Sequence, residues 1–223
     1  QADHVTDITG AEVYLRSANG IGNLRDVELS SPKITANTTG LGAASIELIN
    51  DTSVDAAVQM WTFGTDADIT FDQIGGGNVS FEDVHTNEGD IALTADDGDI
   101  FAVKVEAQGR GYNVFLGTTS EGDVFVDQVN AVDDTVAITS DGAIEELGSD
   151  ELVCDDGEGG NECGSRIVIS ETAAGADLVA THLVLQATDN IGTSDNAIET
   201  EVNESDLGAD NASIYARTTG DAG

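Results

Sequence analysis

The sequence predicts an all-β protein built as a parallel β-helix, in which coils of about 22 residues stack on one another. Three observations predict this fold: a short phrase that recurs along the chain, a nearly constant spacing between its copies, and a composition typical of strands and tight turns. The 223 residues include 26 Gly and 1 Pro, with abundant Thr, Val, Ile and Asp. Because Gly and Asp supply turn conformations that β-branched residues avoid, this composition disfavours a mainly helical protein.

The recurring phrase is a small or turn residue, then Asp or Asn, then Ile or Val, then any residue and a second apolar residue. Each copy has the pattern of a short strand that leaves a turn. The copies are Asp68–Phe71, Asn78–Phe81, Asp90–Leu93, Asp99–Ala102, Asn113–Leu116 and Asp123–Val126.

The spacing divides the phrase into two interleaved series of leading apolar residues. Intervals of 23, 22, 23 and 22 residues separate Ile46, Ile69, Ile91, Val114 and Val136. Intervals of 21, 24 and 20 residues separate Val79, Ile100, Val124 and Ile144. One shared period is what a coil requires when each coil lies about 4.8 Å above the last. An antiparallel β-sandwich is the alternative, but its strands need not keep a constant coil length.

Alternation within each strand predicts which side chains face the core, since successive strand residues point to opposite sides. The first series places these residues inward: Ile46, Leu48, Ile69, Phe71, Ile91, Leu93, Val114, Leu116, Val136, Ile138, Ile167 and Ile169. The second series adds Val79, Phe81, Ile100, Ala102, Val124 and Val126.

An insertion is expected where the period fails. The interval from Val136 to Ile167 is 31 residues, which exceeds one 22-residue coil by 9. This excess matches an outward loop at 154–163, which apart from its two cysteines offers no apolar side chains to pack. The chain as a whole is expected to form a single β-helical segment that spans 1–223 and holds about ten coils. A disulfide between Cys154 and Cys163 would close the loop and implies an oxidising, extracellular location. Two free buried thiols are the alternative.

The charge balance excludes one class of partner. The chain has 43 Asp and Glu against 7 Lys and Arg, a formal net charge of −36, whereas a nucleic-acid binder needs clustered Lys and Arg to neutralise phosphates. No apolar run approaches the roughly 18 residues of a membrane span. The absence of an initiator Met and of a basic-then-apolar leader leads us to expect a processed chain or an excised segment.

The two ends of the chain carry a longer self-match. Ile191–Val202, followed by Ala212–Tyr215, parallels Ile21–Leu29, followed by Ala44–Glu47. With the Gly-Asp-Ile repeats between them, the chain resembles the repeat region of filamentous-haemagglutinin-type adhesins and related giant bacterial surface proteins, over nearly its whole length.

The resemblance implies a right-handed parallel β-helix that is secreted and stands on the cell surface as a stalk or adhesive filament. It implies no catalytic residues. The expected partners are other copies of the chain, adjoining repeats of a longer chain, and a host or surface receptor or a carbohydrate. A self-assembling fibre subunit is an alternative, because an open coil at either end is an unprotected strand edge. The chain departs from the family in being far more acidic.

The sequence favours a non-enzymatic protein over an enzyme. It contains no metallopeptidase, serine-hydrolase, phosphate-loop or haem-attachment motif. With 43 acids, any pair of carboxylates suited to glycoside hydrolysis is easy to find and uninformative. The enzyme alternative is a β-helical polysaccharide-active protein with two carboxylates beside Arg110 or Lys104. For Arg110, between glycines, a charge partner in a loop is the simpler expectation.

Calcium is the metal that the pattern favours, although no cofactor is required. The register stacks Asp68, Asp90 and Asn113 in one turn column, and Asn78, Asp99 and Asp123 in another. Carboxylates stacked about 5 Å apart repel by roughly 1 kcal/mol even at the dielectric of water. The candidate ligands are Asp68, Asp90, Asp99 and Asp123, since calcium takes carboxylate oxygens. A solvated acidic rim screened by salt is the alternative.

Outward aromatic residues are the candidate surface contacts. Phe101 and Phe125 occupy equivalent outward positions in successive coils, and Phe115 lies outward on the other series. An exposed stripe of this kind can contact another chain or a carbohydrate. The alternative is a structural ladder covered by the loop at Gly109–Tyr112. Trp61 is expected in the core or at a coil junction.

Overall fold

The computed structural model describes residues 5–22, 25–147, 176–194, 196–209 and 216–218. Within these ranges the regular secondary structure is all β-strand. The described residues therefore contain no helix of sufficient length and apolar composition to span a membrane. The strands are β1 (Ile8–Thr9), β2 (Val13–Ser17), β3 (Val27–Ser30), β4 (Lys33–Thr38), β5 (Ile46–Asp51), β6 (Ala56–Thr62), β7 (Ile69–Ile74), β8 (Val79–Thr86), β9 (Ile91–Asp96), β10 (Ile100–Ala107), β11 (Val114–Thr119), β12 (Val124–Ser140), β13 (Ile144–Glu146), β14 (Leu178–Ala187), β15 (Ile198–Ala209) and β16 (Ala216–Thr218).

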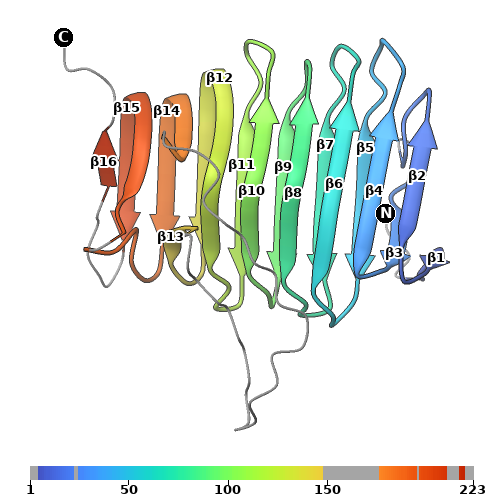
Figure 1. Cartoon of the computed structure of the whole chain (residues 1–223), viewed down its shortest axis with the longest axis horizontal. Coiled ribbons are helices and arrows are strands. Elements are labelled where there is room, and N and C mark those ends of the chain that lie inside the picture. Colours follow the sequence, from blue (N-terminus) through green and yellow to red (C-terminus); the bar gives the residue numbers. More distant parts are fainter. Residues whose placement is uncertain (1–4, 23–24, 148–175, 195, 210–215, 219–223) are drawn as a thin grey trace, which may run out of the picture.

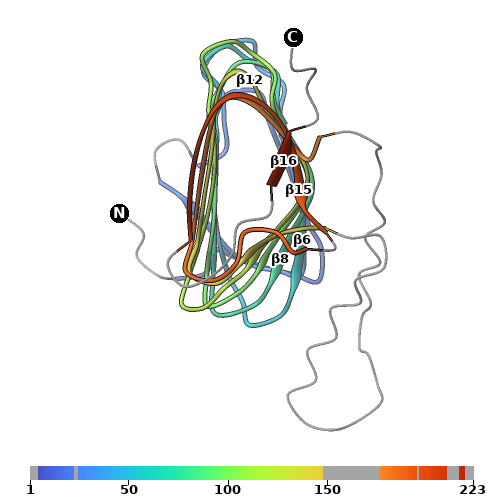
Figure 2. The ribbon, with the colours of Figure 1, turned by 90° about the vertical axis from the view of Figure 1, so that its left-hand side faces the viewer.

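The strands wind into a β-solenoid of about seven turns. One face carries β1, β3, β5, β7, β9, β11 and the second half of β12, and the other carries β2, β4, β6, β8, β10 and the first half of β12. Figure 1 shows these strands side by side along the molecule, and Figure 2 shows the coils as flattened loops stacked along one axis. Every strand pairing among the described residues is parallel, which confirms the β-helix and excludes the antiparallel sandwich.

The two predicted series are confirmed as columns of paired residues. In the first, Ile46, Ile69, Ile91, Val114 and Val136 pair one above another. In the second, Val79, Ile100, Val124 and Ile144 do so. Equivalent residues resemble one another because each inward side chain packs against its counterpart in the next coil.

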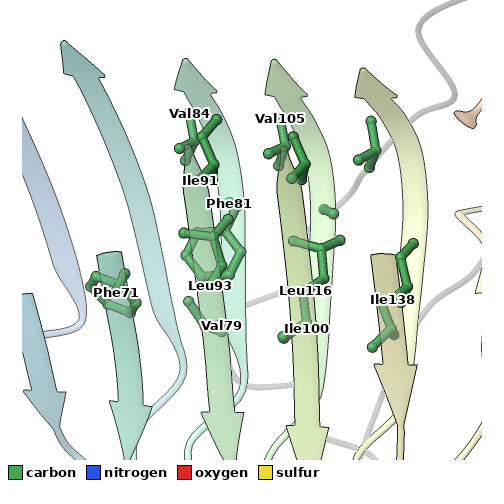
Figure 3. Packing of buried hydrophobic residues seen from close by; sticks show 14 of the residues in the cluster. Phe71, Val79, Phe81, Val84, Ile91, Leu93, Ile100, Val105, Leu116 and Ile138 are labelled. Atoms are coloured by element: carbon green, nitrogen blue, oxygen red, sulfur yellow. The ribbon is translucent and has the colours of Figure 1, made fainter. Parts of the chain in front are cut away.

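The core is a single column of apolar side chains between the two faces. The inward residues predicted from Ile46 to Ile138 are all at most 1% exposed. Phe71 and Phe81 meet across the core edge to face, with ring centroids 5.5 Å apart and planes at 88°, in the geometry that aromatic quadrupoles favour. Figure 3 shows these rings among the neighbouring Ile, Leu and Val side chains.

Glycine lies at a turn where successive coils approach closely. A Cβ on Gly98 would lie 2.5 Å from the carbonyl oxygen of Gly77, and one on Gly122 would lie 2.4 Å from that of Gly98. No side chain fits at these distances, so the turn before the second-series strands needs glycine. The small residue of the recurring phrase therefore sets the close stacking of successive turns.

The first series does not continue from Val136 and Ile138 to Ile167 and Ile169 as predicted, and the facing of Ile167 and Ile169 lies outside the described residues. Val136 pairs with Leu183 and Ile138 pairs with Leu185, so 47 residues separate Val136 from its partner in the next coil. The extra length lies between β13 and β14, both of which pair with β12. The chain therefore forms about seven turns, fewer than the ten expected from its length. The loop at Cys154–Cys163 lies outside the described residues.

Candidate functional site

The two acidic columns predicted to bind calcium form hydrogen-bond ladders to the backbone. In the first column, the N–H of Asp90 donates to Oδ1 of Asp68 (2.9 Å), and the N–H of Asn113 donates to Oδ1 of Asp90 (2.7 Å). In the second column, the N–H groups of Asp99, Asp123 and Ala143 donate to Oδ1 of Asn78, Asp99 and Asp123, at 2.9, 2.9 and 2.6 Å.

These ladders explain why either Asp or Asn can occupy a position in the columns. Both residues present an Oδ1 acceptor at the same distance from the backbone. A carboxylate that accepts a backbone N–H gains a charge-assisted hydrogen bond, which offsets part of the repulsion between stacked acids. The repeat of Asp68, Asp90, Asp99 and Asp123 is thus accounted for by the stacking, and calcium binding there stays a prediction.

A separate carboxylate cluster combines residues from β13, from the position directly before β14 and from β15. Oxygens of Glu146, Asp177 and Glu199 lie within 4.8 Å of one another. Glu146 and Asp177 are only 7% and 5% exposed, and Oδ2 of Asp177 accepts the N–H of Glu199 (2.7 Å). An all-oxygen donor set is the kind that hard cations take. The sequence did not indicate this cluster, because the insertion separates Glu146 from Asp177.

The aromatic residues proposed as surface contacts divide into two environments. Phe101 and Phe125 stack with ring centroids 4.9 Å apart and planes 5° from parallel, and are only 6% and 7% exposed. These two rings therefore form a structural ladder, which was the alternative to a surface contact. Leu147 and Val103 pack against the ladder, in place of the Gly109–Tyr112 loop that was expected to cover it. Phe115 is 38% exposed on β11.

Arg110 takes the role of a charge partner in a loop. Its Nε lies 2.9 Å from Oδ2 of Asp133, and both side chains are largely exposed. Such an exposed pair contributes little to stability. Lys104 lies instead on β10 between two acids, with its Nζ 3.7 Å from Asp83 and 3.4 Å from Glu106.

Trp61 lies on the outer surface, one residue before the end of β6, so the expected core position is wrong and the alternative of a coil junction is left. In the burial pattern of β6, inward residues alternate with partly exposed ones, and Trp61 belongs to the second set. It pairs with Asn37 on one side and His85 on the other, and His85 pairs with Glu106. The outer surface of β4, β6, β8 and β10 thus carries a row of large polar and aromatic side chains.

Asp83 organises this row. Its Oδ2 accepts the Nε1–H of Trp61 (3.2 Å), and its Oδ1 lies 3.3 Å from Nδ1 of His85. A carboxylate can only accept, so Nδ1 of His85 is the donor and, in the neutral ring, Nε2 is left as an acceptor. Asp83 thereby fixes two rings while Lys104 offsets its charge.

Two ring contacts extend the cluster. The His85 ring lies 6.2 Å from that of Trp61 at a tilt of 55°, and 6.1 Å from that of Phe63 in an edge arrangement. Phe63 is 44% exposed. We call this surface the Trp61 face, and it consists of Trp61, Phe63, Asp83, His85, Lys104 and Glu106.

A β-bulge explains why Asp83 points outward. The register between β6 and β8 shifts between Val58 and Gln59, so that Val58 pairs with Phe81 but Gln59 pairs with Asp83. Glu82 is the extra residue, and both Glu82 and Asp83 lie at least partly exposed. Bulges re-aim side chains in this way, often next to functional sites. Strict alternation from Phe81 would have placed Asp83 in the core.

The Trp61 face gathers residue types that are rare in this chain. The sequence contains one Trp, three His and seven Lys and Arg, and only 4% of it is aromatic. The single Trp, one of the His and one of the Lys meet here around one carboxylate.

Comparison with known proteins gives no match to a family model, to a curated protein or to a solved structure.

Proposed function

We infer that the chain is a non-enzymatic structural and adhesive segment of a prokaryotic cell-surface protein, acting outside the cell as a stalk or filament. The observation that supports this role is the use of the repeated polar residues. In the recurring phrase, Gly lets the backbones of successive coils approach closely, and the side-chain oxygens of Asp and Asn accept backbone N–H groups of the next coil.

Stacking of this kind suits a load-bearing rod. Each coil is joined to the next by backbone ladders on both faces, by side-chain ladders at the turns and by a continuous apolar core. Extension of such a rod requires the coils to unwind one after another. The partners in this role are other copies of the chain or adjoining repeats, and a receptor on the opposing surface.

Labelling of intact cells tests the location. Antibodies raised against the purified chain should label non-permeabilised cells of the producing organism, and brief protease treatment of those cells should remove the signal. Labelling that appears only after permeabilisation would contradict the proposal.

Pulling experiments test the mechanical role. When the chain is stretched from both ends in a force microscope, we expect repeated extension steps of about 70–80 Å, because one coil of about 22 residues extends at roughly 3.5 Å per residue. Unfolding in a single step at negligible force would contradict a load-bearing function.

A further inference from the structure

We propose that the Trp61 face is a binding site for neutral carbohydrate, an oligosaccharide or a polysaccharide chain laid across the outer surface of β6, β8 and β10. This inference deepens the adhesive role proposed above and rests on it for its biological setting. It names both the site and the chemical class of the ligand.

The first argument is the combination of ring surfaces and polar groups. Trp61 is partly exposed and Phe63 is 44% exposed, and the two rings flank His85. Aromatic faces carry negative charge density and attract the polarised C–H groups of a sugar ring. Sugar hydroxyls both donate and accept, and Asp83, Lys104 and Glu106 supply acceptors and a donor beside the rings.

The second argument is pre-organisation. Both oxygens of Asp83 are engaged, one with Trp61 and one with His85, so the two rings are held before a ligand arrives. The bulge at Glu82 is what brings Asp83 to this face. A surface whose side chains are already ordered loses less conformational entropy when it binds.

The third argument is charge. The chain carries a formal net charge of −36, and the Trp61 face itself contains two acids against one lysine. An anionic polysaccharide would be repelled, and Lys104 already lies near two carboxylates. The electrostatics therefore favour an uncharged ligand.

The fourth argument is size. A stable protein–protein interface takes about 20–30 residues from each partner. The Trp61 face has six residues, five of them on the adjacent strands β6, β8 and β10 and the sixth, Phe63, directly after β6. That extent fits a few sugar rings better than a folded protein.

Fluorescence offers a direct test, because Trp61 is the single Trp of the chain and its emission reports on this face alone. The probes are neutral hexasaccharides, namely cellohexaose, laminarihexaose, mannohexaose and xylohexaose, with oligogalacturonate as the anionic comparison. We expect a saturable change in emission with at least one neutral hexasaccharide and none with oligogalacturonate at low salt. No response across the neutral panel, or tighter binding of oligogalacturonate, would overturn the proposal.

Variants locate the site, with affinity measured by calorimetry because one of them removes the fluorophore. Trp61→Ala and Asp83→Ala should each weaken binding by at least about tenfold, whereas Trp61→Phe should retain part of it. Phe115→Ala is the matched control, since it removes an exposed ring from the opposite face. An equal loss in Phe115→Ala would overturn the assignment. Circular dichroism of each variant verifies folding, and surface labelling tests the stalk role separately.

Discussion

Replacement of Asp99 tests whether the acidic columns stabilise the fold by accepting backbone N–H groups or whether their negative charge is also required. Oδ1 of Asp99 accepts the N–H of Asp123 at 2.9 Å, in a partly buried position of the second-series turns. Asp99→Ala removes the acceptor and leaves that amide without its side-chain partner. Asp99→Asn keeps an oxygen in the same place and removes only the charge.

The expected magnitudes differ clearly. A hydrogen bond to a charged group contributes about 1.5–3 kcal/mol, and partial access of water lowers this, so Asp99→Ala should cost about 1–2 kcal/mol. For a chain of this size that corresponds to a fall of about 2–8 °C in melting temperature. Asp99→Asn weakens the bond but removes a repulsion from Asp123 of roughly 1 kcal/mol, so its net effect should be below about 0.5 kcal/mol.

Urea unfolding followed by circular dichroism, at pH 7 with a chelator present, measures both variants. Hydrogen exchange at the Asp123 amide should accelerate in Asp99→Ala and not in Asp99→Asn. Glu88→Ala is the matched control, because Glu88 is an exposed acid outside the columns. If Asp99→Asn proved as destabilising as Asp99→Ala, the charge itself would be required and the ladder explanation would be refuted.

Three further predictions concern the same stacking. Gly98→Ala should destabilise the chain by about 1–3 kcal/mol in urea unfolding, since its Cβ would lie 2.5 Å from a backbone oxygen, whereas Gly42→Ala, with open space around the Cβ, should be neutral or slightly stabilising. Burial, with Asp26 and Asp68 nearby, raises the pKa of Glu47, so its ionised form destabilises the fold. Glu47→Gln should therefore be more stable than the parent at pH 7, and this advantage should vanish as the pH falls below the ordinary glutamate pKa; an advantage that persisted there would count against the assignment. The melting temperature should rise when sodium chloride is added on the order of 0.1 M, because salt screens the stacked acids. If millimolar calcium raised the melting temperature, a chelator reversed the rise and the Glu199→Gln variant still showed it, the columns would bind the ion.

The coil period and the core could be predicted because they depend on repetition. A parallel solenoid places Ile69 directly between Ile46 and Ile91, so selection for packing leaves similar residues at equal spacing. The faces followed from alternation alone, and every described residue predicted to point inward does so.

The Trp61 face could not be predicted, because it depends on an irregularity. One extra residue in β8 reverses the alternation after Phe81 and turns Asp83 outward, and a sequence pattern carries no mark of which residue is extra. The residue at which the first series resumes after the insertion could not be predicted for a related reason. Ile167-Val168-Ile169 and Leu183-Val184-Leu185 alternate equally well, and only the register shows that Leu183 and Leu185 stack on Val136 and Ile138.

Pulsed electron resonance between spin labels tests the stacking most directly. One label at Glu47 would be paired in turn with a second at Phe115, Ala137 or Val184, which lie in one outward column, with Cys154 and Cys163 replaced by Ser. The solenoid predicts mean distances of about 14, 19 and 24 Å, an increase of about 4.8 Å per coil. The step from Ala137 to Val184 should equal the others although 47 residues separate them. A disproportionate jump at Val184, or distances that do not rise in equal steps, would contradict the stacked-coil architecture.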